Sequence, residues 1–391
     1  MIRRTLESEL LRLSRKFPVV TLTGPRQSGK TTLCRMAFPE KAYVSLEAPD
    51  VREYARTDPR GFLQDHSRGA ILDEIQRTPD LLSYLQVEVD REPKRGRFIL
   101  TGSANLALLQ SISQSLAGRT ALVNLLPLGL EERRRFPKVS GDLFETLRQG
   151  AYPAIFDREL DSADWFAGYV GTYVERDVRQ ILNVGDLTAF QTFLGLCAGR
   201  TAQLLNLSNL AADVGITHNT ARSWISVLEA GYVTFRLPPF HANWTKRSVK
   251  TPKLHFYDSG LVCYLLGIRN AGQLRSHPMR GAIFESWVVS EILKARLHRG
   301  QPANLFFFRD RKGDEVDLVV QRESGIVAVE MKSAATAAED FFQTLRRFCS
   351  HDVRPRGRTE KPMLVYGGDR IEERSDVRVL PWSSLPDCDW G

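Results

Sequence analysis

Hydrophobic and polar positions follow three different patterns along the chain. Up to about residue 150, short apolar runs alternate with stretches of helical periodicity, the pattern of a parallel sheet wrapped by helices. Residues 165–199 carry apolar and aromatic side chains at helical spacing. Beyond residue 280, a helix is followed by short strands. We therefore expect an α/β protein with domains at residues 1–155, 156–270 and 271–391.

The first predicted strand and helix flank a glycine-rich loop. Residues 19–23 form an apolar run typical of a buried parallel strand, and residues 32–36 begin a helix. Between them, the letters GPRQSGKT have the P-loop spacing of a glycine, four free positions and Gly-Lys-Thr. Backbone N–H groups of such a loop, with the helix N-terminus, bind phosphate oxygens. We predict that a nucleotide contacts Gly24, Pro25, Arg26, Gln27, Ser28, Gly29, Lys30, Thr31 and Thr32.

An acidic pair downstream completes the predicted nucleotide site. Lys30 is expected to reach the β- and γ-phosphates, and the Thr31 hydroxyl to ligate Mg²⁺. Apolar residues 69–72 lead into Asp73, the expected Mg²⁺ partner directly or through water, and Glu74, the expected base for the attacking water. An isolated acidic pair is also typical of a solvated turn. The P-loop requires a strand of this kind, which favours the catalytic interpretation.

A third apolar strand, at residues 97–103, ends in small polar residues. A side chain there can contact the γ-phosphate, and the candidates are Thr101, Ser103 and Asn105. The sequence does not choose among these three.

Two arginines are candidates for neutralising charge on the transferring phosphoryl group. Arg119 lies in the segment LAGRT, and a positioned arginine can add roughly 10³–10⁵ in rate. The competing interpretation is a surface or structural arginine. Arg176 is the second candidate, and an ion pair with Glu175 or Asp177 on a helix is its alternative. An arginine supplied in trans would require a homo-oligomer.

Residues 204–239 predict a winged helix-turn-helix. Residues 207–216 form a short helix that ends in a glycine turn, Thr217 caps a second helix, and residues 231–237 form a strand. In DNA-binding versions, the start of the second helix contacts base edges. In this chain, the residues that would contact DNA are Thr217, His218, Asn219, Thr220 and Arg222. The same module also serves as a lever between domains of nucleotide-driven switches, and the sequence leaves both uses open.

The C-terminal region predicts a helix carrying Glu285, followed by three strands at residues 305–309, 313–320 and 326–333. Glu330 and Lys332 are two residues apart and face the same side of a strand, and Asp317 lies on the neighbouring strand. Asp317 and Glu330 form a carboxylate pair of the kind that binds Mg²⁺ or Mn²⁺, and Glu285 could complete the metal shell. Lys332 could activate a water or stabilise developing charge.

This order of acids and lysine is the pattern of the PD-(D/E)XK nuclease fold. Its competing interpretation is an ordinary hairpin whose Glu-x-Lys is a cross-strand ion pair. A nuclease-like fold kept for binding alone is a further alternative.

Composition narrows the class of protein without naming a partner. The chain of 391 residues is 42% hydrophobic and 26% charged, as in a folded soluble protein. No apolar stretch approaches the roughly 20 residues of a membrane span, and the start lacks a signal-peptide core. Five scattered cysteines without a CxxC pair argue against structural zinc and disulfides, so we expect a cytoplasmic protein.

The formal net charge of +8 permits a polyanionic partner but does not establish one. Basic clusters occur at residues 133–135, at Lys246 and Arg247 with Lys250 and Lys253, and at residues 354–361. The default expectation for each cluster is a solvated face.

The chain resembles prokaryotic AAA-type ATPases with a C-terminal DUF4143 region. The segments that carry this resemblance are, in chain order, GPRQSGKT, ILDEIQ, LTGSAN, LAGR, YVERDV, FE, EVD and VEMK. The resemblance covers nearly the whole chain. It implies an AAA P-loop core, a winged helix and a restriction-endonuclease-like end domain, with ATP rather than GTP as nucleotide. The matching positions are Lys30, Thr31, Asp73, Glu74, Arg119, Glu285, Asp317, Glu330 and Lys332.

Two functions from different classes follow. The first is an ATP- and Mg²⁺-dependent enzyme that couples nucleotide state to DNA binding, with metal-dependent DNA cleavage as an added activity of the end domain. The second is a nucleotide-controlled signalling switch whose winged helix and end domain bind protein partners without cutting DNA.

Overall fold

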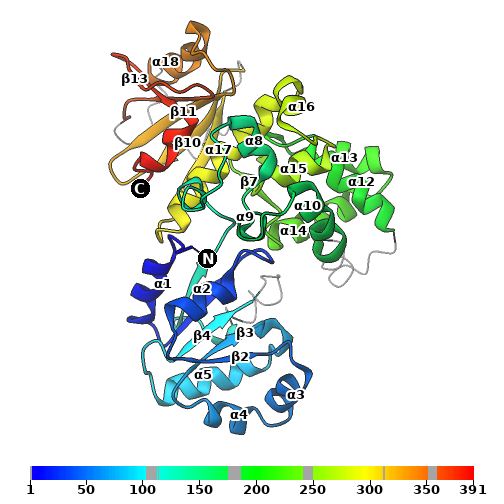
Figure 1. Cartoon of the computed structure of the whole chain (residues 1–391), viewed down its shortest axis with the longest axis vertical. Helices are drawn as coiled ribbons and strands as arrows, with labels where there is room; N and C mark the ends of the chain where they lie inside the picture. Colours follow the sequence, from blue (N-terminus) through cyan, green and yellow to red (C-terminus); the bar gives the residue numbers. More distant parts are fainter. Residues whose placement is uncertain are drawn as a thin grey trace. The chain divides into compact units, whose positions relative to one another are not determined.

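The computed structural model describes residues 2–102, 112, 114–174, 186–240, 250–310, 313–350 and 359–391 (Figure 1). Their contacts form two compact units. Unit 1 comprises Met1–Leu128 with the short segments Ala230–Tyr232 and Leu297–Gly300, and unit 2 comprises the other residues. Residues on both sides of the expected boundary at 270 belong to unit 2, and the division into three domains stays a prediction. None of the helices in the described ranges combines the length and apolar character of a bilayer span.

Unit 1 contains a parallel sheet, as the sequence predicted, and this sheet has five strands, of which the one at residues 42–45 was not predicted. Its spatial order is β2 (Ala42–Ser45), β3 (Ala70–Asp73), β4 (Phe98–Thr101), β1 (Val19–Thr23) and β5 (Thr120–Asn124). Because all strands are parallel, their carboxyl ends meet at one edge of the sheet. The P-loop follows β1 and Asp73 ends β3, so both lie at that edge.

Helices cover both faces of this sheet (Figure 1). One apolar cluster joins alternate strand residues such as Val20 to α1 (Glu7–Ser14) and α2 (Lys30–Ala37). The second joins the intervening residues, such as Val19, to helices on the other face: α3 (Pro49–Thr57), α4 (Pro59–Asp65) and α5 (Leu81–Arg91). Burial on both faces explains why these strands are continuous apolar runs.

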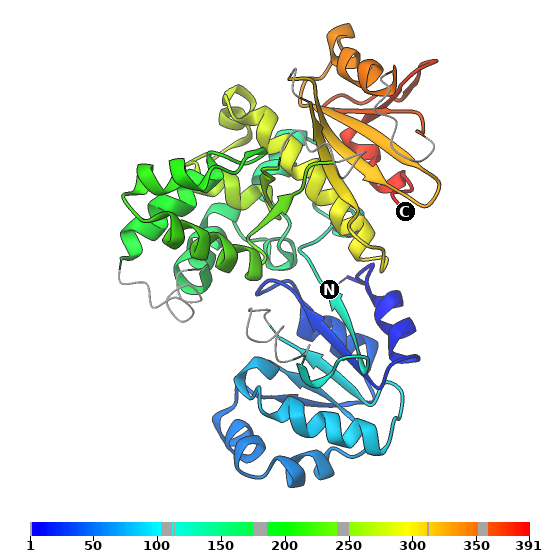
Figure 2. The ribbon, with the colours of Figure 1, turned by 180° about the vertical axis from the view of Figure 1, so that it is seen from behind.

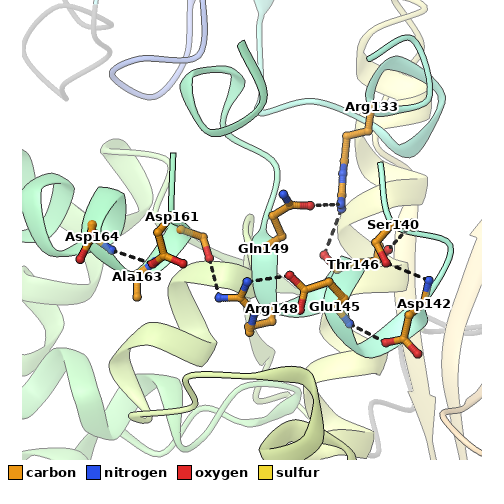
Figure 3. A network of polar contacts seen from close by, with 11 residues as sticks. Arg133, Ser140, Asp142, Glu145, Thr146, Arg148, Gln149, Asp161, Ala163 and Asp164 are labelled. Atoms are coloured by element: carbon orange, nitrogen blue, oxygen red, sulfur yellow. Dashed lines mark hydrogen bonds and ion pairs between the residues drawn. The ribbon is translucent and has the colours of Figure 1, made fainter. Parts of the chain in front are cut away.

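Unit 2 begins with short helices: α7 (Leu130–Arg133), α8 (Leu143–Gln149), α9 (Pro153–Asp157) and α10 (Ser162–Tyr169). A polar network fixes where two of them start (Figure 3). Asp142 caps α8 by accepting from the Glu145 N–H at 2.9 Å, and Asp161 caps α10 by accepting from the Ala163 N–H at 2.8 Å. Arg148 joins the two helices by donating to Ser162 Oγ at 3.0 Å. Each such cap is worth about 1 kcal/mol.

The predicted helix-turn-helix is present in the middle of the chain. It follows α12 (Leu187–Ala198) and consists of α13 (Leu207–Val214) and α14 (His218–Ala230). Gly215 ends α13 with φ +78°, a left-handed conformation that favours glycine, and Thr217 Oγ1 accepts from the Thr220 N–H at 3.1 Å. An antiparallel sheet accompanies the helices, in the order β6 (Gln203–Leu204), β8 (Lys253–Phe256), β7 (Thr234–Leu237).

Three further helices lead into the C-terminal sheet (Figure 2): α15 (Ser259–Leu265), α16 (Ala271–Ser276) and the long α17 (Arg280–Leu297). The three strands predicted for this region are present as β9 (Leu305–Arg309), β10 (Glu315–Gln321) and β11 (Ile326–Lys332). The sheet has six strands, however, in the order β13-β14-β12-β11-β10-β9.

Three of these strands were not predicted: β12 (Met363–Tyr366), β13 (Glu372–Glu373) and β14 (Arg378–Pro381). The 3-10 turn Glu339–Phe342 and α18 (Gln343–Ser350) pack on one face of the sheet through Phe342, Leu345 and Phe348.

Candidate functional site

The P-loop joins the end of β1 to the start of α2, as predicted. Gly24 has φ +151°, and a Cβ atom there would lie 2.2 Å from the Leu125 carbonyl oxygen, so a larger residue would displace the backbone. Gly29 has φ +92° and immediately precedes α2. Glycine is therefore required at both ends of the loop, for close approach at one end and for a left-handed turn at the other.

Lys30 points back into this loop. Its Nζ donates to the Pro25 carbonyl at 2.7 Å and to the Gly24 carbonyl at 3.1 Å, and the residue is 6% exposed. Burial lowers the pKa of Lys30 to about 8, although Glu74 and Asp73 nearby oppose this effect. The Lys30 ammonium contacts two carbonyl dipoles of the loop, and a bound phosphate would offer it a full negative charge instead.

Two residues of unit 1 add to the loop in ways that the sequence did not predict in detail. Arg4 donates to the Ser28 carbonyl at 2.6 Å and to the Leu126 carbonyl at 2.8 Å, so it ties the loop to the segment after β5. No local signal marked Arg4, because it lies far from the motif in sequence. The Ser28 hydroxyl is buried and has no hydrogen-bond partner among the described residues, which suits a loop that receives a polar ligand.

Asp73 accepts hydrogen bonds from three hydroxyl groups. Its Oδ2 accepts from Thr31 at 3.0 Å and from Tyr43 at 2.7 Å, and its Oδ1 accepts from Thr101. The expected Mg²⁺ partners Thr31 and Asp73 thus lie together. A hydroxyl and a carboxylate are the hard oxygen donors that Mg²⁺ prefers, so these residues fit the metal that accompanies ATP.

Of the three candidates at the end of β4, Thr101 contacts Asp73, and Ser103 and Asn105 lie outside the described residues.

Tyr43 is a component of the site that sequence reasoning missed. It lies on β2, the edge strand of the sheet, and is 39% exposed. Burial of the hydroxyl and its bond to Asp73 raise the pKa of Tyr43 to about 12, so it remains a donor. Only the pairing of β2 with β3, where Ser45 is opposite Asp73, brings this side chain to the acid.

Glu74 follows Asp73 in an unusual backbone conformation. Its φ is +59°, a left-handed value that is uncommon outside glycine and is concentrated at functional sites. Its Oε2 accepts from Gln76 Nε2. Burial raises the pKa of Glu74 above its ordinary value, which moves this carboxylate toward the range of an effective base. Its role as the catalytic base stays a prediction.

The structure changes the expectation for Arg119. Its guanidinium forms two hydrogen bonds with the Asp90 carboxylate, at 2.5 and 2.7 Å, on the surface of the unit. Its carbonyl accepts from the N–H of Val19, the first residue of β1, whereas the P-loop follows the last. Five strand residues span about 16 Å. Arg119 therefore lies far from the nucleotide loop of its own chain, and only a role in trans stays a prediction. Arg176 lies outside the described residues.

The proposed DNA-contacting residues lie at the start of α14. Thr217, His218, Asn219 and Arg222 are exposed, and Thr220 is half-buried with its N–H on the Thr217 hydroxyl. This placement is the one expected for a recognition helix. Contact with DNA stays a prediction.

The C-terminal acids and lysine lie together, with Asp317 and Glu330 buried, Glu285 partly buried and Lys332 35% exposed. Lys332 Nζ lies 2.6 Å from Glu330 Oε1, and Asp317 accepts from the Met331 N–H at 2.9 Å. The pairing of β10 with β9 shifts between Val316 and Val319, a β-bulge that contains Asp317. Burial, with the negative charge of Asp317, raises the pKa of both Glu285 and Glu330 to about 8.

Lys253 changes the character of this cluster. We expected it on a solvated face, but its side chain is only 3% exposed. Its Nζ lies 2.7 Å from Glu285 Oε1 and 2.6 Å from Glu315 Oε1. Burial lowers the pKa of Lys253, but Glu285, Asp317 and Glu315 outweigh burial and raise it overall. Within the described residues, no three His, Cys, Asp or Glu side chains are arranged to hold a metal ion. The expected metal shell of Glu285, Asp317 and Glu330 thus contains an ammonium group beside Glu285.

Three known families match consecutive parts of the chain. The AAA domain matches residues 16–133, a domain of unknown function (DUF8612) matches residues 140–272, and a second domain of unknown function (DUF4143) matches residues 280–385. The winged helix-turn-helix falls within the DUF8612 match.

Two curated relatives cover most of the chain. Uncharacterized protein Rv2008c of Mycobacterium tuberculosis and uncharacterized protein Mb2031c of Mycobacterium bovis are each 34% identical over 336 residues, which is 85% of this chain and 74% of theirs. Among solved structures, the Walker-type ATPase PABY2304 of Pyrococcus abyssi aligns with 66% of this chain and 94% of its own, at 14% identity and a TM-score of 0.46. AMPPCP-bound DnaA from Aquifex aeolicus aligns with 57% of this chain and 86% of its own, at 14% identity and a TM-score of 0.29.

The family matches follow one another along the chain, and the P-loop, Thr31 and Asp73 meet at the edge of a parallel sheet. The chain belongs to the AAA-type P-loop ATPases that carry a C-terminal DUF4143 domain.

Proposed function

We propose that the protein binds and hydrolyses ATP with Mg²⁺, and that the nucleotide state controls DNA binding by the winged helix. The observation that carries the first part is the meeting of Lys30, Thr31 and Asp73 at one edge of the sheet. The backbone N–H groups of the P-loop and the Lys30 ammonium would bind the phosphates. Thr31 and Asp73 would hold Mg²⁺, which neutralises charge on the β- and γ-phosphates when it is bound.

Glu74 would take a proton from the attacking water. A raised pKa suits this step, because the carboxylate is then a stronger base. Thr101 donates to Asp73 from the end of β4, which keeps the carboxylate oriented toward Thr31.

The proposed DNA contact rests on the exposed start of α14 and on the net charge of +8. A protein that neutralises 6–10 phosphates loses about 10³–10⁵ in affinity between 50 and 200 mM salt. Strong salt dependence is therefore the signature to measure in a DNA titration with ATP present. A flat salt profile, or no binding, would argue against DNA as the partner.

A second candidate function is a nucleotide-controlled switch that binds a protein partner and cuts no DNA. The position of Lys253 within the C-terminal carboxylate cluster favours this version over a metal-dependent nuclease. ATP turnover that is slow and independent of DNA would support the switch. Cleavage of linear or supercoiled DNA that Asp317→Ala and Lys332→Ala both abolish would support the nuclease.

The ATPase proposal itself is tested with two substitutions. Lys30→Ala removes the cation of the P-loop and is expected to abolish binding of a fluorescent ATP analogue, whereas Lys16→Ala, at an exposed lysine, is the matched control. Glu74→Gln is expected to retain bound ATP and to slow hydrolysis by about 10²–10⁴. Wild-type hydrolysis by Glu74→Gln would show that another group is the base, and Glu40→Gln at an exposed glutamate controls for charge.

A further inference from the structure

Lys253 is held rigidly beside Glu285. The lysine begins β8, and the helix that carries Glu285 is α17. Two hydrogen bonds join these elements: the Phe256 N–H donates to Ser286 Oγ at 3.2 Å, and Ser290 Oγ donates to the Tyr257 carbonyl at 2.8 Å. The ammonium also lies 5.6 Å from the centre of the Phe307 ring, within the range of a cation–π contact. Lys253 is therefore an ordered buried cation, unlike a mobile surface lysine.

The carboxylates around Lys253 are stabilised by a positive charge in this position. Four carboxylates are gathered here: Glu285, Glu315, Asp317 and Glu330. Buried carboxylates are costly unless they are paired. Lys332 pairs with Glu330 at 2.6 Å, which leaves Glu285 and Glu315 to Lys253. Arg309, which is 40% exposed, lies 3.4 Å from Glu315.

We propose that Lys253 is the resident cation of this carboxylate cluster and occupies the side of Glu285 that a divalent metal would need. With Lys253 in place, no three carboxylates of the described residues are arranged to hold a metal ion, so the cluster accepts Mg²⁺ or Mn²⁺ only when the removal of Lys253 lets Glu285 rearrange. This inference does not depend on ATP hydrolysis at the P-loop.

Charge repulsion disfavours a divalent metal on the Glu285 carboxylate while Lys253 is paired with it. Mg²⁺ requires oxygen ligands at 2.0–2.1 Å in a nearly octahedral shell. A metal on the Glu285 carboxylate would lie within a few ångströms of the Lys253 ammonium, where the repulsion between a single and a double positive charge is strong in a poorly solvated site. The Glu330 Oε2 atom is buried and has no hydrogen-bond partner among the described residues, so the cluster retains a donor for a metal once the ammonium has gone.

Binding of Mn²⁺ to the full-length, EDTA-treated, nucleotide-free protein tests this proposal. Electron paramagnetic resonance would measure free Mn²⁺, and binding is assigned to the cluster only where Asp317→Asn removes it. The wild-type protein is expected to show no binding that depends on Asp317. Lys253→Met is expected to gain one such site, with an affinity at least about tenfold above the detection limit of the wild-type titration. Lys253→Arg, which keeps the positive charge, is expected to behave as wild type.

Two results would overturn the proposal: a wild-type site that depends on Asp317 with the affinity of Lys253→Met, or a folded Lys253→Met protein without such a site. A cooperative thermal transition shows that the variant is folded. If Lys253→Met does not fold, the double variant Lys253→Met/Glu315→Gln removes the lysine together with one of its two acidic partners and leaves Glu285, Asp317 and Glu330. A folded double variant should bind Mn²⁺, and its failure to do so counts against the proposal. If neither variant folds, the wild-type titration decides, because binding that depends on Asp317 contradicts the proposal and its absence supports it.

Discussion

The Tyr43 hydroxyl donates a 2.7 Å hydrogen bond to Asp73 Oδ2, the same oxygen that accepts from Thr31. With Thr101 on Oδ1, the carboxylate is held by three hydroxyl groups from three different elements. Thr101 is fully buried, whereas Tyr43 lies on the edge strand and is 39% exposed. Tyr43 is therefore the donor with the most freedom to leave when a metal-bound water approaches Asp73.

Tyr43→Phe is expected to lower the Mg²⁺ concentration needed for half-maximal ATP binding by about two- to tenfold, the worth of one hydrogen bond. The hydroxyl occupies a lone pair of Oδ2 that a metal-bound water would otherwise use. The measurement is a Mg²⁺ titration of a fluorescent ATP analogue. Tyr54→Phe is the matched control, because Tyr54 is 38% exposed and donates to Asp65 at 2.7 Å. A higher Mg²⁺ requirement would show that Tyr43 positions Asp73 and does not compete with the metal.

Arg119→Ala is expected to hydrolyse ATP at close to the wild-type rate, because Arg119 is engaged by Asp90 at the far end of β1 from the P-loop. Steady-state ATPase assays at several protein concentrations would measure this. Arg91→Ala, at another arginine of unit 1, is the control. Loss of activity that is restored by mixing Arg119→Ala with Lys30→Ala would instead show that Arg119 acts on the site of a second copy.

His255 is expected to make the folded state less stable in mild acid. The residue is fully buried, both ring nitrogens have no hydrogen-bond partner within the described ranges, and burial, with the positive charge of Lys253, lowers the pKa of His255 well below its ordinary value. An unfolded histidine has a pKa of about 6.5, so below that pH the unfolded state binds a proton that the folded state excludes. The free energy of unfolding should therefore fall by up to about 1.4 kcal/mol for each pH unit below 6.5.

The measurement is urea unfolding between pH 7 and pH 5. His255→Phe should flatten the pH dependence while it keeps the ring contact with Phe235, whose centre lies 5.4 Å away. His218→Phe, at an exposed histidine, should leave the dependence as it is in the wild type. An unchanged slope in His255→Phe would show that other groups control acid stability.

Arg222→Ala is expected to weaken DNA binding and to reduce the slope of log affinity against log salt by about one unit, as for the loss of one phosphate contact. The residue is exposed at the start of α14. Fluorescence anisotropy at several salt concentrations measures both quantities. Arg236→Ala is the control, because that guanidinium is already paired with Glu229 at 2.7 Å. An equal effect of both variants would indicate a diffuse electrostatic attraction without a recognition helix.

Local patterns were sufficient to predict the elements that carry the proposed nucleotide site. The P-loop letters, the apolar strand before them and the acidic pair after a second strand predict elements that form within a few residues of each other. The bonds from Lys30 to the loop carbonyls and from Thr31 to Asp73 agree with that prediction. The turn Gly215 and the capping residue Thr217 were also visible in the sequence, because caps and turns depend on adjacent residues.

Other features depend on which strands become neighbours. Tyr43 reaches Asp73 because β2 pairs with β3, and Arg119 lies away from the P-loop because β5 runs parallel to β1. The strands β12 to β14 lacked a recognisable signal in the sequence, and they complete the C-terminal sheet by pairing beyond β11.

The sequence by itself determined the P-loop, the acidic pair, the helix-turn-helix and the order of acids in the C-terminal region, because each is encoded by residue type and short-range spacing. Only the tertiary structure decided that Lys253, which belongs to a basic stretch in the sequence, is buried between Glu285 and Glu315. The physical reason is that burial and ion pairing depend on contacts between segments far apart along the chain. A lysine has the same hydropathy in the sequence whether it is solvated or enclosed by carboxylates.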